Sequence, residues 1–503
     1  MQGAGITHWI ERLVASRAVR SAYTSLVGHV ALLIVLALLA IGHTTPPRPT
    51  PVLIGMVDVA RDEDPGAGAA VIATADAAEA APGDPVPDAT VPLPHADEVT
   101  PEPLPAEIPD AHAAQAADFG PPALADIAAD LPAAPGTGGT RMASHAPAGR
   151  AEHRADAYAG RRAGGRAAGV RDRGGSATSE AAVERGLAWL ARHQAADGSW
   201  RFDLSGCRCD GGCRDAGTVT STTAATGIAL LPFLGAGHTH VEGTHRETVT
   251  RGIYYLMSRM RPTPRGGDLC EGTMYGQGVA TLALAEALGM TRDDMLQRYV
   301  SDGVRFIETA QDMHGGGWRY LPGQAGDTTV TGWQLAALKS AALAGVAVPT
   351  PTIDAACRFL DRVQVRYGEA YGYQSPQAKP ATSAVGLLCR LYTGWRNEAA
   401  IDSGLGALAR PGPAPQAIYQ NFYLSQALLQ RSHPAWPKWN ARNRDQLVAA
   451  QAGFGHELGS WFFADPDTAP GGRLAHTALA VLTLEVYYRL LPIYTADAVE
   501  TEF

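Results

Sequence analysis

One phrase recurs along the C-terminal two thirds of this 503-residue chain and constrains its fold more than any other feature. In each copy a glutamine ends a stretch with helical apolar spacing, and a glycine-rich turn then leads to an aromatic residue. The copies run from Gln194 to Trp200, Gln311 to Trp318, Gln364 to Tyr373 and Gln451 to Trp461. Because self-similarity at a regular spacing is typical of repeat architectures, the sequence predicts a repeated structural unit.

Residues 177–503 divide into six pairs of stretches whose apolar residues recur at helical spacing. The pairs are 180–193 with 221–236, 247–260 with 273–289, 295–310 with 328–345, 353–365 with 381–394, 402–409 with 416–430, and 443–451 with 473–491. The first member carries charges on one face and the second is apolar all round, so we expect polar-faced outer helices around apolar inner helices. Six hairpins in two layers can close into a ring. The sequence therefore predicts an all-α (α/α)6 toroid, with an open stack as the alternative.

The N-terminal segment has a different character. Residues 1–21 carry Arg12, Arg17 and Arg20, whereas residues 22–42 contain no Asp, Glu, Lys or Arg. A helix of about 20 apolar residues spans a bilayer core, and a basic flank favours the cytoplasmic side. We expect a single-pass anchor in the cell inner membrane, with the C-terminal domain in the periplasm. A cleaved signal peptide is the alternative.

Residues 43–176 are rich in Ala, Pro, Gly, Asp and Glu and lack clusters of large apolar side chains. Such a segment cannot bury enough apolar surface to offset its ordering entropy, so we expect a disordered linker. The net charge of −9 gives no reason to expect nucleic acid as a partner, since binding phosphate backbones needs a concentrated basic face. The membrane is the expected partner instead.

The repeated phrases resemble the QW motifs of the terpenoid cyclase and protein prenyltransferase superfamily. They are similar in particular to squalene cyclase-like "prenyltransferase and squalene oxidase repeat" proteins anchored in the membranes of planctomycete-type bacteria. The likeness covers 177–503 and rests on VERGLAWLARHQAADGSW, GTMYGQGVATLAL, GGGWRYLPGQAGDTTVTGWQLAALKS and GGRLAHTALAVLTLEVYYR. It implies the toroid fold and a structural role for the tryptophans. The Gln amide would bond backbone groups at the start of a neighbouring helix, where N–H donors need acceptors.

The resemblance also implies chemistry that is incomplete here. The cyclases protonate their substrate with an Asp-x-Asp-Asp-Thr motif, and the matching stretch is Gln324-Ala325-Gly326-Asp327-Thr328, with glycine in the place of the proton donor. The prenyltransferases hold zinc through Asp, Cys and His. Asp327 and His476 resemble two of these ligands, but Thr329 replaces the cysteine and is a poor zinc ligand. Asp327 and His476 are therefore the candidate catalytic residues.

The stretches expected to form the inner helices begin with polar or aromatic residues. If the helices converge, these residues ring one mouth of the barrel. We expect the ligand to contact Tyr275, Thr331, Trp333, Thr382, Tyr419 and Asn421. A polar rim above an apolar throat suits an amphiphile, such as an isoprenoid with a polar head. Taken singly, each residue also fits an ordinary helix cap or core position.

The densest sulfur cluster is CRCDGGC, which contains Cys207, Cys209 and Cys213. As a zinc site it needs a fourth ligand, for which the candidates are His193, His238 and Cys270. Outside the cytoplasm a disulfide is equally in keeping with the pattern, and free thiols are a third state. The spacing alone leaves these three states open.

Three functions fit the sequence. The first, which we favour, is a binding or scaffold protein that holds a lipid-like or peptide ligand. The second is a terpenoid cyclase or prenyltransferase-like enzyme that uses Asp327 and His476. The third is a glycan-active toroid, which needs two carboxyl groups about 5–10 Å apart in the cavity. For that role the inner stretches offer only Asp327, Glu286 and Glu485. Asp465 and Asp467 resemble the acid motif of the cyclases in part and are either a displaced acid pair or a solvated turn.

Overall fold

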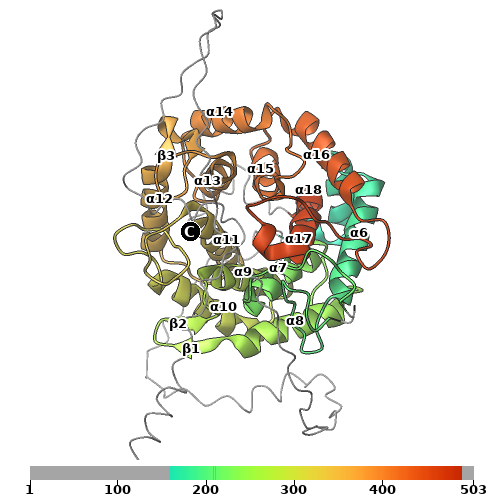
Figure 1. The fold of residues 1–503 in the computed structure, drawn as a ribbon. Helices are drawn as coiled ribbons and strands as arrows, with labels where there is room; N and C mark the ends of the chain where they lie inside the picture. Colours follow the sequence, from blue (N-terminus) through green and yellow to red (C-terminus); the bar gives the residue numbers. More distant parts are fainter. Residues whose placement is uncertain (1–157, 208, 210, 490–503) are drawn as a thin grey trace, which may run out of the picture.

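The computed structural model describes residues 158–207, 209 and 211–489, and these form two concentric rings of helices (Figure 1). The outer helices are α6 (Ala177–Arg192), α8 (Arg246–Arg259), α10 (Asp294–Thr309), α12 (Thr350–Val363), α14 (Glu398–Ala409) and α16 (Trp436–Ala450). The inner helices are α7 (Thr222–Gly235), α9 (Met274–Thr291), α11 (Thr328–Leu343), α13 (Pro380–Tyr392), α15 (Ile418–Gln430) and α17 (Gly472–Leu484). Each outer helix is followed in the chain by an inner one, which confirms the six predicted hairpins.

The inner ring is closed. Each inner helix contacts the next one along the chain, and α17 contacts α7 to complete the circle. Each outer helix also packs on the inner helix of the preceding hairpin, as α8 does on α7, and α6 packs on α17 in the same way. The alternative of an open stack is therefore wrong. Closure buries the apolar surfaces that the first and last hairpins of an open stack would expose to water.

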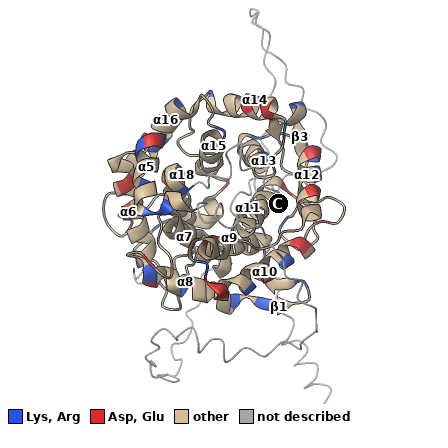
Figure 2. Ribbon diagram, turned by 180° about the vertical axis from the view of Figure 1, so that it is seen from behind, with Lys and Arg blue, Asp and Glu red and all other residues tan. Residues whose placement is uncertain are grey.

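The two rings differ in burial as the sequence predicts. In α9 every residue from Met274 to Leu288 is buried, whereas α10 buries one face, with Leu296, Val300 and Val304 among its buried residues. The Lys, Arg, Asp and Glu residues lie mostly on the outer helices (Figure 2). Helices that touch protein on all sides need no polar face, and helices at the rim do.

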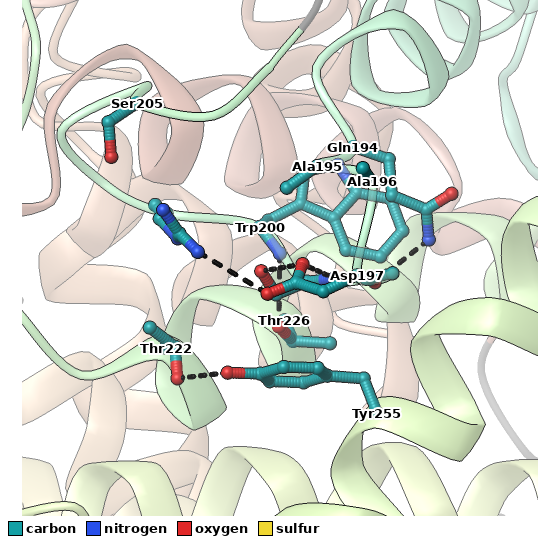
Figure 3. Close-up of polar contacts among 12 residues, drawn as sticks. Gln194, Ala195, Ala196, Asp197, Trp200, Ser205, Thr222, Thr226 and Tyr255 are labelled. Carbon is teal, nitrogen blue, oxygen red and sulfur yellow. Dashed lines mark hydrogen bonds and ion pairs between the residues drawn. The ribbon is translucent and has the colours of Figure 1, made fainter. Parts of the chain in front are cut away.

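The tryptophan of the repeated phrase ties an outer helix to its inner partner. The Trp200 indole Nε1 donates to the carbonyl oxygen of Leu190 in α6 at 2.8 Å. Its backbone N–H donates to the Thr226 hydroxyl in α7 at 3.1 Å (Figure 3). The same two bonds join Trp318 to Ile307 and Thr331, and Trp461 to Leu447 and Thr477. We call this set of contacts the clasp. Its recurrence confirms a structural role for these tryptophans.

The glutamine of the clasp reaches the next hairpin. Gln194 Nε2 donates to the carbonyl oxygens of Gly198 in its own turn and Thr248 near the start of α8, each at 2.9 Å. Gln311 bonds Gly316 and Thr352 in this way, and Gln451 bonds Gly459 and Ala182. The amide thus donates to carbonyl oxygens, and the expected acceptance of helix N–H groups is wrong. Because Gln451 reaches Ala182 in α6, the clasp also closes the ring.

The fourth copy of the phrase departs from this pattern. Its buried aromatic is Tyr371, whose N–H donates to Ser383 Oγ in α13 at 3.0 Å. The predicted end of the phrase at Tyr373 is wrong by two residues. Short strands β3 (Gln364–Val365) and β4 (Ala370–Tyr371) pair around the 3-10 turn η2 (Arg366–Gly368), and this pairing sets the position of Tyr371. The remaining short elements are β1 (Arg261–Thr263), paired with β2 (Gly266–Asp268), and the 3-10 turn η3 (Ala469–Gly471).

A short N-terminal segment closes one end of the barrel. The 3-10 turn η1 (Ala159–Arg161) and helix α5 (Ala163–Arg173) pack against α18 (Val486–Arg489). Arg161 is buried, and its Nη1 donates to the Leu234 carbonyl at the end of α7 and to Glu286 in α9. The expectation of a disordered linker up to residue 176 is therefore wrong from residue 158 onward. The reason is that arginines of this segment find acidic partners on distant elements.

The predicted anchor at 22–42 and the linker from 43 to 157 lie outside the described residues. Among the residues that the structure does describe, no helix is both long enough and apolar enough to cross a bilayer.

Candidate functional site

The mouth of the barrel lies at the N-terminal ends of the inner helices and is built around Asp327, the N-cap of α11. Its Oδ1 accepts hydrogen bonds from the Val330 N–H and the Thr329 hydroxyl, each at 2.8 Å. Its Oδ2 accepts one from the Tyr373 hydroxyl at 3.1 Å. The side chain is fully buried, and burial raises the pKa of this carboxyl to about 6 even though the hydrogen bonds oppose the shift.

A chain of hydroxyl groups connects this carboxyl to the half-buried surface of the mouth. Tyr373 donates its proton to Asp327, so the Tyr320 hydroxyl at 2.5 Å donates to Tyr373. The Arg319 guanidinium lies over both tyrosine rings, 5.0 Å from the centre of one and 5.8 Å from the other. Asp327 itself touches no solvent, but Tyr373 is half-buried. A ligand that enters the mouth and hydrogen-bonds to Tyr373 is therefore linked to the Asp327 carboxyl through the Tyr373 hydroxyl.

Aromatic rings line the cavity between the inner helices. Trp333 of α11 stacks on Phe422 of α15 at a centroid distance of 6.0 Å and meets Tyr423 edge-on. Tyr419 packs against Tyr423 at 4.9 Å. Faces of this kind accept hydrocarbon chains and cationic groups. At the opposite end of the same cavity stand Arg161, Glu286 and Arg489, so the space is apolar on one side and charged on the other.

The six residues expected to contact the ligand fall into two groups. Trp333 lines the cavity, Tyr275 bonds Thr329 through its hydroxyl at 2.7 Å, and Tyr419 stands against Tyr423. The other three hold loops: Thr331 receives the Trp318 N–H, Thr382 donates to the Tyr371 carbonyl and Asn421 donates to the Ala414 carbonyl. The side chains of Thr331, Thr382 and Asn421 therefore position the turns above the inner helices.

Sequence reasoning missed Arg319, Tyr320 and Tyr373. A signal for the two tyrosines was present, because each follows the clasp aromatic of its own loop by two residues, after Trp318 and Tyr371 respectively. A side chain two residues along an extended segment lies on the same side as the buried aromatic, and here it points to the mouth.

His476 lies apart from Asp327 and shares no partner with it. Its Nδ1 accepts the Phe463 N–H at 3.2 Å, and its Nε2 pairs with the Thr468 hydroxyl at 2.6 Å. The ring is fully buried, and burial lowers the pKa of this imidazole to about 3. With both nitrogens engaged, this histidine is suited to fixing the 463–468 loop as a neutral ring.

The two loop aspartates near His476 have different surroundings. Asp465 is buried and accepts the backbone N–H groups of Tyr419 and Asp467. Asp467 is half-exposed, and burial together with the charge of Asp465 raises the pKa of its carboxyl to about 6. Asp465 therefore joins the loop to α15, and Asp467 is the more accessible carboxyl.

The cysteine loop lies beside the C-terminal end of α6. The Nε2 of His193 is 3.0 Å from Cys213 Sγ, and Cys207 Sγ is 2.8 Å from Cys209 Sγ. The other two candidates for a fourth ligand lie elsewhere. Cys270 faces Met274 and Gln277, and His238 meets His245 and Glu184 in a separate group. Of the three candidates the structure brings only His193 to the cysteines.

Comparison with known proteins supports the architecture. Residues 168–281, which include the first clasp, match the family model of the squalene-hopene cyclase C-terminal domain. With the closed double ring, this match makes the described part of the chain a squalene cyclase-like helical toroid. A search of curated proteins found no match.

Several solved structures are similar in outline. One is an alpha-1,6-mannanase of glycoside hydrolase family 76 from Salegentibacter sp., at 11% identity, 61% coverage of this chain, 99% of that one and a TM-score of 0.43. A second is cellobiose 2-epimerase from Bacillus thermoamylovorans, at 12% identity, 61% coverage of this chain, 97% of that one and a TM-score of 0.45. A third is a family 76 mannosidase from Bacteroides thetaiotaomicron, at 12% identity, 62% coverage of this chain, 98% of that one and a TM-score of 0.43. Likenesses of this size carry no information on activity.

Proposed function

We propose that this squalene cyclase-like toroid binds an amphiphile with an isoprenoid-like apolar body in the space between its inner helices. The cavity that Trp333, Phe422 and Tyr423 line has a volume of about 30 Å³, so these rings would move apart to admit the apolar body. The polar head would meet Tyr373 at the mouth. The observation that carries the proposal is the pairing of an aromatic wall with the buried Asp327 carboxyl, which reaches the mouth through a hydroxyl chain. Pockets that combine apolar walls with a few placed polar groups are typical of such ligands.

One end of the barrel is closed, so a ligand would enter from the other end. Arg161 and α5 occupy the end that holds Glu286, opposite to Asp327. A tether to the inner membrane, which we also propose from residues 22–42, would join the toroid at that closed end. The mouth then stays free to receive a ligand on the periplasmic side.

A second candidate function, acid-catalysed chemistry on the same ligand, is favoured by the state of Asp327. A carboxyl with a pKa of about 6 carries its proton in a useful fraction near neutral pH. The proton would sit on Oδ2, since Oδ1 already accepts two hydrogen bonds. With Oδ2 protonated, its hydrogen bond to Tyr373 reverses: Oδ2 donates to the Tyr373 oxygen, and the Tyr373 hydroxyl then donates its own proton to Tyr320 or to a group at the mouth. His476 has no part in this path.

Binding can be tested with the full-length protein. Lipids that co-purify with it should be identified by mass spectrometry, and farnesol should be titrated into the lipid-free protein. We expect Trp333→Leu and Tyr373→Phe to weaken farnesol binding at least about tenfold, the size of one lost hydrogen bond or ring contact. Trp395→Leu is the matched control, because Trp395 stacks on Arg390 away from the cavity wall. Equal affinity in all four proteins, or no binding by any, would refute the proposal.

The catalytic candidate has its own readout. Incubation of the protein with squalene or a shorter polyprene should give a cyclised or hydrated product that Asp327→Asn no longer forms. If the unaltered protein binds the polyprene and returns it unchanged, binding stands and catalysis is rejected.

A further inference from the structure

We propose that Cys207, Cys209, Cys213 and His193 together bind one zinc ion, which fastens the cysteine loop to the end of α6. The ligand atoms of His193, Cys209 and Cys213 all lie within 4.8 Å of one another, and Cys207 Sγ adjoins Cys209 Sγ. Three thiolates and one imidazole form a common set for structural zinc. Zinc–sulfur bonds of about 2.3 Å set sulfur atoms about 3.8 Å apart in a tetrahedron. To complete the site, the Cys207 and Cys209 sulfurs would separate by about 1 Å, and Cys207 would move toward His193 and Cys213.

The orientation of His193 suits a metal ligand. Its Nδ1 is 2.7 Å from the Trp189 carbonyl oxygen, which can only accept, so Nδ1 carries the ring proton. Nε2 is therefore unprotonated, and its lone pair points at Cys213 Sγ, 3.0 Å away. The Trp189 ring stacks on the imidazole at 3.8 Å and holds its plane. A backbone carbonyl that fixes the tautomer in this way is a usual partner of zinc-bound histidine.

The loop returns its third cysteine to the other two. The Gly212 N–H donates to the Cys209 carbonyl oxygen at 2.9 Å, a turn that sets Cys213 beside Cys209. Two of the sulfurs, of Cys209 and Cys213, are then gathered with the His193 nitrogen, and the Cys207 sulfur adjoins that of Cys209. A disulfide would join two of these sulfurs and leave the third cysteine and His193 outside the bond, whereas a metal ion would bind all four side chains.

The position of the proposed site indicates a structural role for the ion. The Trp189 indole donates to the His456 carbonyl at 3.1 Å, and Arg214 pairs with Glu457 in the loop of the sixth hairpin. The cysteine loop therefore bridges the first and sixth hairpins, at the point where the ring closes. Zinc held there would lock the ring closed and leave the mouth and its hydroxyl chain unchanged.

Zinc content of the full-length protein, purified without chelators, tests the site. We expect one zinc per chain in the unaltered protein, and less than about a tenth of that in Cys213→Ser and His193→Ala, since three ligands hold zinc far more weakly than four. His193→Cys should retain the ion as a four-cysteine site. Cys357→Ser is the matched control, because Cys357 lies on α12 outside the group.

A second measurement does not depend on the variants folding. Titration of the unaltered protein with a mercurial should release one zinc as three thiols react. The proposal is overturned if the protein holds no zinc after loading with zinc sulfate and dialysis, or if Cys213→Ser and His193→Ala retain it. It is equally overturned if mass spectrometry finds a disulfide between two of the three cysteines.

Discussion

At the scale of the residue, three glycines show how tightly the turns are specified. Gly198, Gly316 and Gly459 stand two positions before the clasp tryptophans and have φ values of 88°, 76° and 93°. A Cβ at these positions would lie 2.5, 2.0 and 2.4 Å from a carbonyl oxygen of the next outer helix. Two effects therefore disfavour any side chain at these three positions: the positive backbone angle φ and the close approach of the neighbouring hairpin.

Alanine substitutions can separate these two effects. Gly323 also has a positive φ, 75°, but a Cβ there meets nothing within 4 Å. We expect Gly323→Ala to lower the free energy of unfolding by about 1–2 kcal/mol, the cost of the backbone angle alone. Gly316→Ala should lower it by at least about 2 kcal/mol more, because its Cβ would also push α12 away. Urea unfolding measures both, and equal losses would contradict the role of the close approach.

Asp327 should make stability depend on pH in a defined direction. The pKa of its carboxyl is raised from 3.8 to about 6 in the folded protein, so the folded state binds the proton more tightly than the unfolded chain. Its contribution to stability is greatest below pH 4 and is lost as pH rises through about 6. Asp327→Asn removes this titration and should keep the helix cap.

The stability of Asp327→Asn relative to the unaltered protein should therefore rise with pH, by up to about 3 kcal/mol between pH 4 and pH 7. Urea unfolding at both pH values gives the difference, in which all other titrating groups cancel. A difference that stays constant with pH would show that Asp327 titrates normally.

At the scale of the element, the clasp explains how amphipathic hairpins become a ring. The Trp bonds join the outer and inner helices of one hairpin, and the Gln bonds reach the outer helix of the next. Apolar burial drives the helices together but sets no particular neighbour. The directional bonds of the clasp set the order and angle in which hairpins follow one another.

Removal of a clasp glutamine should destabilise the toroid measurably. Gln311→Ala removes two hydrogen bonds, to Gly316 and Thr352, and should lower the free energy of unfolding by about 2 kcal/mol. Gln364→Ala is the matched control, because the buried Oε1 of Gln364 has no hydrogen-bond partner. It should change stability by less than about 0.5 kcal/mol. Chemical denaturation compares the two, and a larger loss in Gln364→Ala would overturn the assignment.

At the scale of the whole molecule, a buried ion cluster joins both ends of the described chain to the barrel. Glu286 of α9 accepts from Arg161 at 2.8 Å and from Arg489 at 3.0 Å, and all three side chains are buried. Burial alone would raise the pKa of Glu286, but the two guanidinium groups outweigh it and lower the pKa. The cluster closes the barrel at the end opposite to the mouth.

Breaking this ion cluster should destabilise the folded protein. Glu286→Gln removes the carboxylate that pairs directly with both buried arginines and should lower the free energy of unfolding at neutral pH by about 3–5 kcal/mol. Because the folded pKa of Glu286 lies below its usual value, its contribution is present above pH 4.5 and is lost as pH falls further. Asp172→Asn, which breaks the exposed pair with Arg171, is the control and should have little effect. Thermal unfolding should show the same order.

The sequence by itself determined the helical hairpins, their two layers and the tryptophan clasp. These features depend on spacing within short segments, and apolar periodicity and tight-turn glycines are visible there. Asp327 was identified from the resemblance of its stretch to the acid motif of the cyclases, and the structure shows that it is also the N-cap of α11.

Only the tertiary structure decided how side chains from different hairpins meet. Closure of the ring brings Tyr373 to Asp327, His193 to the cysteine loop and Arg161 to Glu286. It also separates His476 from Asp327, and it engages the inner-helix residues Thr331, Thr382 and Asn421 in hydrogen bonds to the backbone of the turns above them. No local pattern carries this information, because each contact depends on the angles at which successive hairpins pack, and those angles are set by the whole ring.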